Sequence, residues 1–302
     1  MRKIEVYSEN RSDEGLLEDV RKQVKADNDL ELVTEDGDIL VVLGDRPAVL
    51  KKALEYVEEH KPVAHISGGE KTVGCVDDYT RHAITKMSHI HFTSTDEYRN
   101  RVLQLGEIDD MVHYVGEPGL DDLKTEDNVF LEEHFLITYH PTFDDSNIDD
   151  LFLALKNVNR KLIFTAPQKD KGYKFVVSKI KAFVKENPQS EYVESMGRKK
   201  YLSYLKWARA VIGNSSSGIV EAPSYGTPCI NIGDRQKGRT QGFNVINCKL
   251  DKEEIMEAIM KAKRIETTSN PYRKDGNAIK NIIHILKTVD MEDIMIKEFR
   301  DR

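Results

Sequence analysis

Three consecutive hydroxyl side chains, those of Ser215, Ser216 and Ser217, follow an apolar segment that ends at Gly213. The segment predicts a buried strand, and the residues after the serines predict a helix that runs through Glu221. Backbone N–H groups at a helix start, together with serine hydroxyls, form an anion site that needs no metal. Helix capping alone is the alternative, since serines often cap helices. Three serines between glycines favour the anion site, and the Glu221 carboxylate could accept hydrogen bonds from ribose hydroxyls.

Two further polar side chains follow predicted strands directly. His140 comes after the strand expected at 135–139, and a histidine there can donate to a phosphate or to a leaving oxygen. The alternative is a solvated ring at a strand end. Asp45 follows the strand expected at 38–43 and could act as a base or bind a sugar hydroxyl. It could instead cap the helix that begins near Pro47, because proline is favoured at the first helical position.

A group of carboxylates follows the strand expected at 63–67. Gly68 and Gly69 allow the backbone to approach a ligand closely, and Glu70 lies at the apex of the turn. Asp77 and Arg81 begin the next helix, where a spacing of four residues also fits an exposed ion pair. Several carboxylates near a histidine are what removal of a proton from carbon requires. One group takes the proton while another protects or protonates the leaving side.

Other fingerprints of chemistry are weak or missing. Arg11 follows the first expected strand and could neutralise a phosphate, although a lone loop arginine is usually solvated. The sequence contains no glycine-rich dinucleotide motif after a strand and no phosphate-binding loop of the ATPase type. His89 and His91 alternate on a strand without nearby carboxylate or cysteine partners, which favours structural roles over metal ligation. We therefore expect neither NAD, ATP nor a metal.

The elements that must position these residues alternate regularly. Short β-branched runs alternate with amphipathic stretches, which predicts βαβ units and parallel sheets. The expected strands are 4–8, 30–33, 38–43, 63–67, 89–93, 112–116, 135–139, 161–165, 192–194, 210–213, 228–232 and 244–247. Helical patterns cover 14–25, 47–59, 78–87 and 95–105 in the first half, and 278–287 and 291–300 at the end.

The alternation breaks around Gly116, where a polar segment predicts a connection between two α/β lobes. We expect an N-terminal Rossmann-like lobe at 1–117 and a C-terminal lobe at 118–288. Residues 289–302 would form a final helix that packs back on the first lobe. Ligands of doubly wound sheets bind at the carboxyl ends of the strands, so we expect the two lobes to face each other across a cleft.

The composition is that of a globular protein. The chain has 302 residues, 39% hydrophobic and 32% charged, with a net charge of −7 and both signs interspersed. This balance argues against nucleic acid or an anionic membrane as the main partner. Cys75, Cys229 and Cys248 are far apart, so neither disulfides nor a zinc site is predicted. No secretion signal or membrane span is recognisable, which predicts a cytoplasmic location.

Several of these motifs together resemble the UDP-N-acetylglucosamine 2-epimerase family, and in particular its hydrolysing branch, which forms N-acetylmannosamine. The non-hydrolysing branch usually reads D-S-G-G-x-x-E-E where this chain reads NSSSGIVE at 214–221. The similarity runs from about residue 38 to residue 242. The motifs that carry it are DR (45–46), HISGGE (65–70), DDYTRHAITKMS (77–88), HFTSTDEY (91–98), VGEPGLD (115–121), TYHP (138–141) and GNSSSGIVEAPSYGTPCINIGDRQKGR (213–239).

The resemblance implies a GT-B fold of two Rossmann-like lobes, with the nucleotide held mainly by the second lobe and with no need for NAD or an obligatory metal. It implies that the C2 proton of the sugar is removed while UDP is expelled from C1, which gives a glycal. Water then adds with inversion at C2 and N-acetylmannosamine is released. The implied partner is a nucleotide sugar, and a homodimer is expected.

The resemblance also assigns residues by position. Asp45, Glu70 and Asp77 are its acid–base candidates, and Arg81 orients them. The residues that it assigns to the nucleotide are Ser215, Ser216, Ser217, His140 and Arg235 for the diphosphate, Arg11 for the phosphates from the first lobe, and Glu221 for the ribose. His140 also counts as catalytic, because it can donate to the leaving oxygen.

Departures from the family pattern leave alternatives open. Ser67 stands where a second histidine is usual, Val73 where a glutamate is usual, and Arg11 lacks its preceding glycine. The first lobe is also shortened by some tens of residues between its first strands. A non-hydrolysing epimerase, a GT-B glycosyltransferase and a nucleotide-sugar binding protein of impaired activity are therefore the alternatives.

Overall fold

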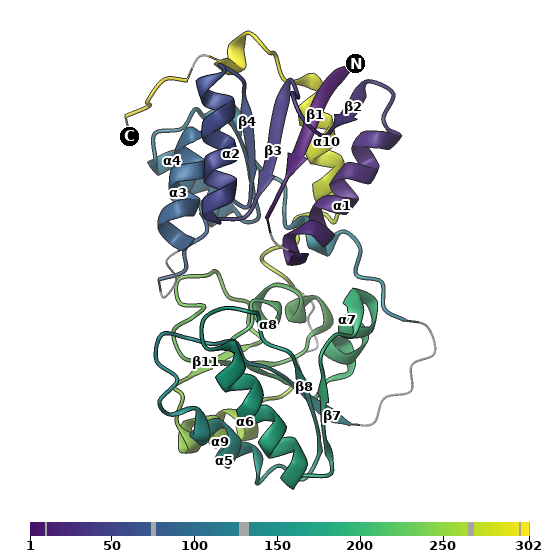
Figure 1. The fold of residues 1–302 in the computed structure, drawn as a ribbon, viewed down its shortest axis with the longest axis vertical. Helices are drawn as coiled ribbons and strands as arrows, with labels where there is room; N and C mark the ends of the chain where they lie inside the picture. The colour runs from purple at the N-terminus through teal and green to yellow at the C-terminus, as the bar shows by residue number, and fades with distance from the viewer. Residues whose placement is uncertain (10, 74–76, 127–132, 265–268, 296, 302) are drawn as a thin grey trace. The chain divides into compact units, whose positions relative to one another are not determined.

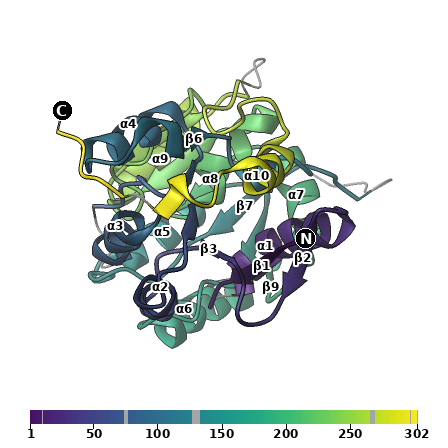
Figure 2. The same cartoon turned by 90° about the horizontal axis from the view of Figure 1, so that it is seen from above.

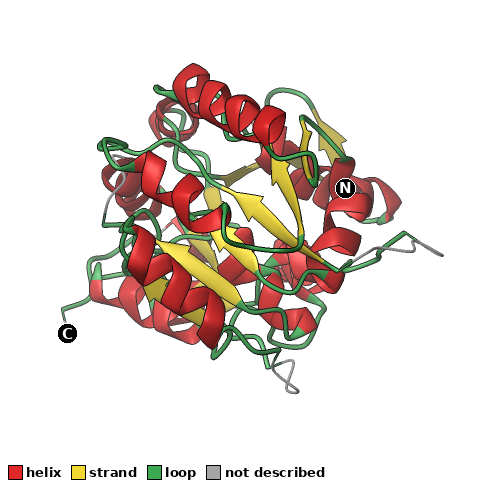
Figure 3. Ribbon diagram, turned by 90° about the horizontal axis from the view of Figure 1, so that it is seen from below, coloured by secondary structure: helices red, strands yellow, loops and turns green. Residues whose placement is uncertain are grey.

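The computed structural model describes residues 1–302 except 10, 74–76, 127–132, 265–268, 296 and 302. Contacts divide the chain into two compact units. The first combines Met1–Asp122 with Tyr272–Arg302, and the second is Leu123–Pro271. Each unit is a parallel sheet with helices on both faces (Figure 1 and Figure 3). Among the described helices, none is both long and apolar enough to cross a membrane.

The first unit has a six-stranded sheet in the order β2-β1-β3-β4-β5-β6. Its strands are β1 (Arg2–Tyr7), β2 (Leu30–Val33), β3 (Ile39–Leu43), β4 (Val63–Ile66), β5 (Ile90–Thr93) and β6 (Val112–Tyr114). Its helices are α1 (Arg11–Ala26), α2 (Pro47–Glu58), α3 (Asp77–Met87), α4 (Asp96–Gln104) and α10 (Ala278–Thr288), with short 3-10 helices η1 (Asp109–Met111), η2 (Pro118–Leu120) and η4 (Asp293–Met295). β3 reads ILVVL and is buried on both faces, as parallel strands covered by helices require.

Helices α1 and α10 cover one face of this sheet, where Leu17 and Val20 of α1 share a core with Ile282 and Leu286 of α10. Helices α2 and α3 cover the other face and lie side by side in both Figure 1 and Figure 2.

The second unit has a sheet in the order β12-β11-β10-β7-β8-β9. Its strands are β7 (His134–Thr138), β8 (Lys161–Thr165), β9 (Ser190–Val193), β10 (Val211–Gly213), β11 (Cys229–Ile232) and β12 (Val245–Cys248). Its helices are α5 (Ile148–Leu155), α6 (Tyr173–Glu186), α7 (Gly197–Trp207), α8 (Ser217–Val220), η3 (Ala222–Tyr225) and α9 (Lys252–Lys261). The chain reverses direction across the sheet between β7 and β10. Such a switch point is where doubly wound sheets bind ligands.

The predicted doubly wound α/β class is confirmed, and every expected strand occurs within two residues of its expected bounds. Two expectations were wrong. Residues 272–288 belong to the first unit and not the second, because the apolar face of α10 packs on α1 and the first sheet. The segment 291–300 is not a helix: η4 is the only helical turn among its described residues. Lys297 instead reaches the carbonyl of Ser88 and the carboxylate of Glu107.

Candidate functional site

The switch point of the second unit is locked by a pair of loops. Gly213 at the end of β10 has φ +141°, and a Cβ there would lie 2.1 Å from the carbonyl oxygen of Thr138 in β7. Only glycine permits this approach. Directly after the two strands, Asn214 Oδ1 accepts from the His140 amide at 2.6 Å, and Asn214 Nδ2 donates to the His140 carbonyl at 2.8 Å. The two loops are therefore fixed to each other where a ligand would bind.

His140 is buried within this turn, so the alternative interpretation, a solvated ring at the strand end, was wrong. Its Nδ1 accepts from the backbone amide of Gln168 at 3.0 Å. Burial and the charge of Arg235 lower the pKa of His140 to about 3, which keeps the ring neutral. A neutral ring that accepts at Nδ1 carries its hydrogen on Nε2, and a phosphate oxygen needs such a donor.

Arg235 follows β11 and joins three strand ends. Its guanidinium donates to the carbonyl of Asn214 at 3.0 Å and to Oε1 of Gln168 at 3.1 Å. The side chain of Gln236 donates to the same Asn214 carbonyl at 3.0 Å. A cation is thus held beside His140 and the serine run. Asn214, Gln168 and Gln236 were not predicted, although a polar residue directly after a strand that ends in glycine is a usable signal for the first of them.

The serines do more than cap a helix. Ser216 precedes α8 without making a side-chain capping bond. The hydroxyl of Ser217 bonds Ser215 Oγ at 3.1 Å and the hydroxyl of Tyr201 at 2.5 Å. Burial raises the pKa of Tyr201 to about 12, so its hydroxyl keeps its proton. The serines therefore belong to a hydroxyl chain beside the locked loops.

The helix after the serines is shorter than predicted. α8 ends at Val220, and Glu221 joins it to η3. The Glu221 side chain is 19% exposed and lies 3.7 Å from the guanidinium of Arg198. Burial raises the pKa of Glu221, and the charge of Arg198 opposes that shift. Glu221 is thus a sheltered acceptor, and its partner Arg198 was not predicted.

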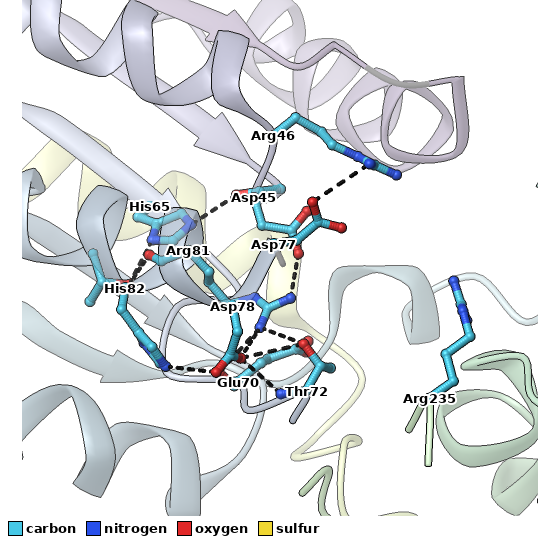
Figure 4. Close-up of polar contacts among 12 residues, drawn as sticks. Asp45, Arg46, His65, Glu70, Thr72, Asp77, Asp78, Arg81, His82 and Arg235 are labelled. Carbon is cyan, nitrogen blue, oxygen red and sulfur yellow. Dashed lines mark hydrogen bonds and ion pairs between the residues drawn. The ribbon is translucent and has the colours of Figure 1, made fainter. Parts of the chain in front are cut away.

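In the first unit, the Arg81 side chain contacts residues that follow the strands β3 and β4 (Figure 4). The side chain is almost fully buried and pairs with a carboxylate oxygen of Asp45. It also donates to Asp78 at 2.8 Å, to the hydroxyl of Thr72 at 3.1 Å and to the carbonyl of Glu70 at 3.3 Å. Arg81 therefore joins the loop after β3, the loop after β4 and helix α3.

Two alternative interpretations of these residues were wrong. Asp77 does not form an exposed pair with Arg81: it lies 3.6 Å from Arg46, while Arg81 pairs with Asp78 and Asp45. Asp45 does not cap α2, because Arg46 occupies that position. Burial raises the pKa of Asp45. The Arg81 charge opposes the shift, and Asp77 and Glu70 reinforce it. A carboxylate in this setting is a stronger base than a solvated one.

A second cluster lies at the ends of β4 and β5 and was only partly foreseen. Ser67 has φ +63°, and its hydroxyl lies 3.3 Å from both Ser94 Oγ and Glu117 Oε2. Ser94 donates to the same Glu117 oxygen at 2.7 Å. Ser94 and Glu117 were missed, although both follow predicted strands.

The structure thus gathers the predicted residues into two sets. Asp45, Glu70, Asp77 and Arg81 lie together in the first unit. The second set, in the second unit, is His140, Ser215, Ser216, Ser217, Arg235 and Glu221. Arg11 begins α1, but its side chain lies outside the described part of the structure. Among the described residues, no group of three or more histidine, cysteine or acidic side chains has the arrangement of a metal site.

Comparison with known proteins decides the family. The family model described as UDP-N-acetylglucosamine 2-epimerase matches residues 8–287. The chain belongs to this family. GDP/UDP-N,N'-diacetylbacillosamine 2-epimerase (hydrolyzing) of Campylobacter jejuni is 37% identical to it over 291 residues, covering 87% of this chain and 75% of that protein. Polysialic acid biosynthesis protein P7 of Escherichia coli is 36% identical over 289 residues, covering 87% and 73%.

Solved structures of the epimerase family share the fold. The UDP-N-acetylglucosamine 2-epimerase of Neisseria meningitidis bound to UDP-N-acetylglucosamine superposes with a TM-score of 0.79 at 16% identity and covers 95% of this chain and 99% of that one. The S. aureus MnaA complex with UDP gives 0.81 at 16% identity, with both chains covered completely. These structures confirm the predicted GT-B type of two Rossmann-like units. The family model and the relatives at 36–37% identity show that the chain is a sugar-nucleotide 2-epimerase.

Proposed function

We propose that this epimerase is hydrolysing: it converts UDP-N-acetylglucosamine, or a related acetamido sugar nucleotide, into UDP and the free 2-epimer, N-acetylmannosamine for the first substrate. The observation that carries the proposal is the half-buried carboxylate of Asp45, which pairs with Arg81 and has Glu70 and Asp77 nearby. The Campylobacter jejuni relative at 37% identity supports it, since that protein is named as hydrolysing.

The second unit would hold the nucleotide. The Nε2–H of His140, the hydroxyls of the serine run (Ser215, Ser216 and Ser217) and the cation of Arg235 would bind the diphosphate, with Arg11 as a further phosphate ligand. Charge-assisted donors stabilise a diphosphate as it leaves with the electron pair of the C1–O bond. Glu221 would accept from the ribose hydroxyls. His140 is the group that we assign to the leaving oxygen, because its ring stays neutral and offers a hydrogen there.

The first unit would carry out the proton transfers. A carboxylate among Asp45, Glu70 and Asp77 takes the C2 proton, the C1–O bond to UDP breaks, and a C1=C2 double bond forms. A proton then adds to the opposite face of C2, and water adds its oxygen to C1. The positively charged Arg81 keeps these carboxylates in position throughout the reaction. The reaction removes and adds protons without net oxidation, so its chemistry calls for no nicotinamide.

The decisive experiment runs the reaction in deuterated water. We expect UDP to be released together with N-acetylmannosamine that carries deuterium at C2. UDP-N,N'-diacetylbacillosamine should be offered in parallel, because the Campylobacter jejuni relative is named for that sugar. Asp45→Asn should lower turnover by about 100-fold or more, the usual contribution of one acid–base group. Asp109→Asn, a matched change at an exposed site of the same unit, should leave the rate unchanged.

Three results would argue against the proposal. UDP-linked 2-epimer without free sugar would indicate a non-hydrolysing epimerase. Sugar transfer to an acceptor without deuterium at C2 would indicate a glycosyltransferase. UDP binding in calorimetry without turnover of any acetamido sugar nucleotide would indicate a binding protein.

A further inference from the structure

His65 lies among the proposed acid–base residues but is fully buried, so it does not reach a substrate. Its two ring nitrogens face different elements. Nδ1 lies 3.1 Å from the hydroxyl oxygen of Thr85 in α3. Nε2 lies 3.2 Å from the carbonyl oxygen of Gly44, the residue directly before Asp45. The ring therefore bridges helix α3 and the turn that presents Asp45 (Figure 4).

The direction of both hydrogen bonds follows from the partners. Burial lowers the pKa of His65 to about 3, so the ring is neutral and carries one hydrogen. The Gly44 carbonyl can only accept, so that hydrogen is on Nε2. Nδ1 must then accept, and the Thr85 hydroxyl must donate to it. The same hydroxyl donates to the carbonyl of Arg81 at 2.9 Å, so its single hydrogen is shared between that carbonyl and His65 Nδ1.

The surroundings leave room for this bridge and for little else. A Cβ on Gly68 would lie 3.0 Å from the Thr85 hydroxyl oxygen and 3.1 Å from His65 Nδ1. The first glycine of the Gly68–Gly69 pair is thus needed to pack against the bridge, a role that differs from approach to a ligand. Thr85 lies one helical turn after Arg81 in α3, so one end of the bridge holds the helix that carries Arg81. The other end holds the turn that carries Asp45.

We propose that His65 is a positioning residue: it passes a hydrogen bond from Thr85 to the Gly44 carbonyl and thereby fixes Asp45 against Arg81. The proposal rests on the proposed function only for what the pair does to a sugar nucleotide. The placement of the pair itself is independent of any substrate.

The charges around the pair give a measurable consequence. Asp45 faces Arg81, which lowers its pKa, and Asp77 and Glu70, which raise it. His65 itself faces Arg81, His82 and His91. Burial makes the largest contribution and raises the pKa of Asp45. If the turn moves away from α3, the burial of Asp45 and its distances to Arg81 and Asp77 all change, so the pKa of Asp45 changes with them.

Two substitutions separate the hydrogen bond from the space that the ring fills. His65→Leu removes the donor to Gly44, whereas His65→Gln keeps an N–H near the place of Nε2. The matched control is His89→Gln, since His89 is another buried histidine of the same unit, lies directly before β5 and accepts from the Val63 amide. The pKa of Asp45 is read by ¹³C NMR of carboxyl-labelled aspartate, with Asp45→Asn to assign the signal. kcat, KM and UDP affinity are measured on the same proteins.

We expect the pKa of Asp45 to change in His65→Leu, to return towards the wild-type value in His65→Gln, and to stay unchanged in His89→Gln. kcat should fall by about 100-fold in His65→Leu, the usual effect of a displacement of about 1 Å, with KM and UDP affinity within about 2-fold. An unchanged Asp45 pKa in His65→Leu, or an equal loss of kcat in His89→Gln, overturns the proposal.

The NMR measurement needs no substrate, so it decides the role of His65 even if the wild-type protein releases no UDP. That second result would count against the proposed function alone. If His65→Leu does not fold, Thr85→Val removes only the hydroxyl that begins the bridge. A change in the pKa of Asp45 is expected there too, and its absence would overturn the proposal.

Discussion

Arg81 carries a permanent positive charge at a site that water scarcely reaches, with 5% of its side chain exposed. It pairs there with Asp45 and Asp78, whose side chains are each 23% exposed. Replacing Arg81 by Met keeps most of the volume and removes the charge. Both carboxylates then lose their cation, and the carbonyl of Glu70 and the hydroxyl of Thr72 lose a donor.

The expected cost follows from the burial of the pair. Breaking a buried ion pair by removing one partner costs about 3–5 kcal/mol. The partly exposed carboxylates place this case at the lower end, about 3 kcal/mol. For a unit of this size, with a urea dependence of about 2 kcal/mol per molar, that is a shift of about 1.5 M in the unfolding midpoint. Adding Asp45→Asn to Arg81→Met should restore about 1–2 kcal/mol of the free energy of unfolding, because the carboxylate that had lost its cation is then removed.

The assay can separate the two units, because the chain has one tryptophan. Trp207 lies in α7 of the second unit, so its fluorescence follows that unit, whereas far-ultraviolet circular dichroism follows both. We expect Arg81→Met to move an early circular dichroism transition to lower urea and to leave the fluorescence midpoint unchanged. Arg101→Met, a change at an arginine that is 22% exposed in the same unit, should cost less than about 1 kcal/mol. Equal losses in the two variants would refute the reasoning from burial.

Two further outcomes are expected in the second unit. The pKa of His140 is about 3 in the folded state and about 6.5 in the unfolded chain, so the unfolded chain binds more protons between these values. The contribution of His140 to the free energy of unfolding is therefore fully present above about pH 6.5 and is lost as the pH falls. The loss from this residue is about 1.4 kcal/mol at pH 5.5. Urea titrations followed by Trp207 at pH 7.5 and 5.5 test this, and a midpoint that rises on acidification contradicts it. Gly213→Ala should prevent correct folding of this unit or cost more than about 3 kcal/mol, because its methyl group meets the Thr138 carbonyl. A fluorescence midpoint within about 0.3 M of wild type would contradict that expectation.

The alternation of short apolar runs with amphipathic stretches was sufficient to predict the fold class. Short apolar runs between helical patterns are typical of parallel strands that are buried on both faces. It was not sufficient for the assignment of α10. The helical period of 278–288 shows an apolar face, with Ile282 and Leu286, but it does not say which of two sheets that face covers. The same limit applies to 291–300, where anchoring by Lys297 replaced the expected helix.

The sequence also located most of the candidate site, for a topological reason. Residues directly after parallel strands meet at one edge of a sheet, so Asp45, Glu70 and His140 could be picked out one strand at a time. Their partners could not, because pairing depends on the rotation of the side chains. Arg81 pairs with Asp78 and Asp45, and Asn214 bonds the backbone of His140 across two strands. Spacing along the chain indicates neither contact.

The place of α10 in the first unit has a consequence for synthesis. Helix α10 supplies Ile279, Ile282 and Leu286 to the core that also contains Ile4 of β1 and Leu17 of α1. During synthesis on the ribosome, the first unit can therefore complete its core only after α10 is made, and α10 follows the whole second unit. The intervening stretch, residues 123–277, has about 155 residues and takes on the order of 10 to 30 s to translate. During that time the part of this core that α10 covers stays exposed, while the second unit, which is continuous in sequence, already has its strands β7 to β12. The part of the chain made first would thus be completed last.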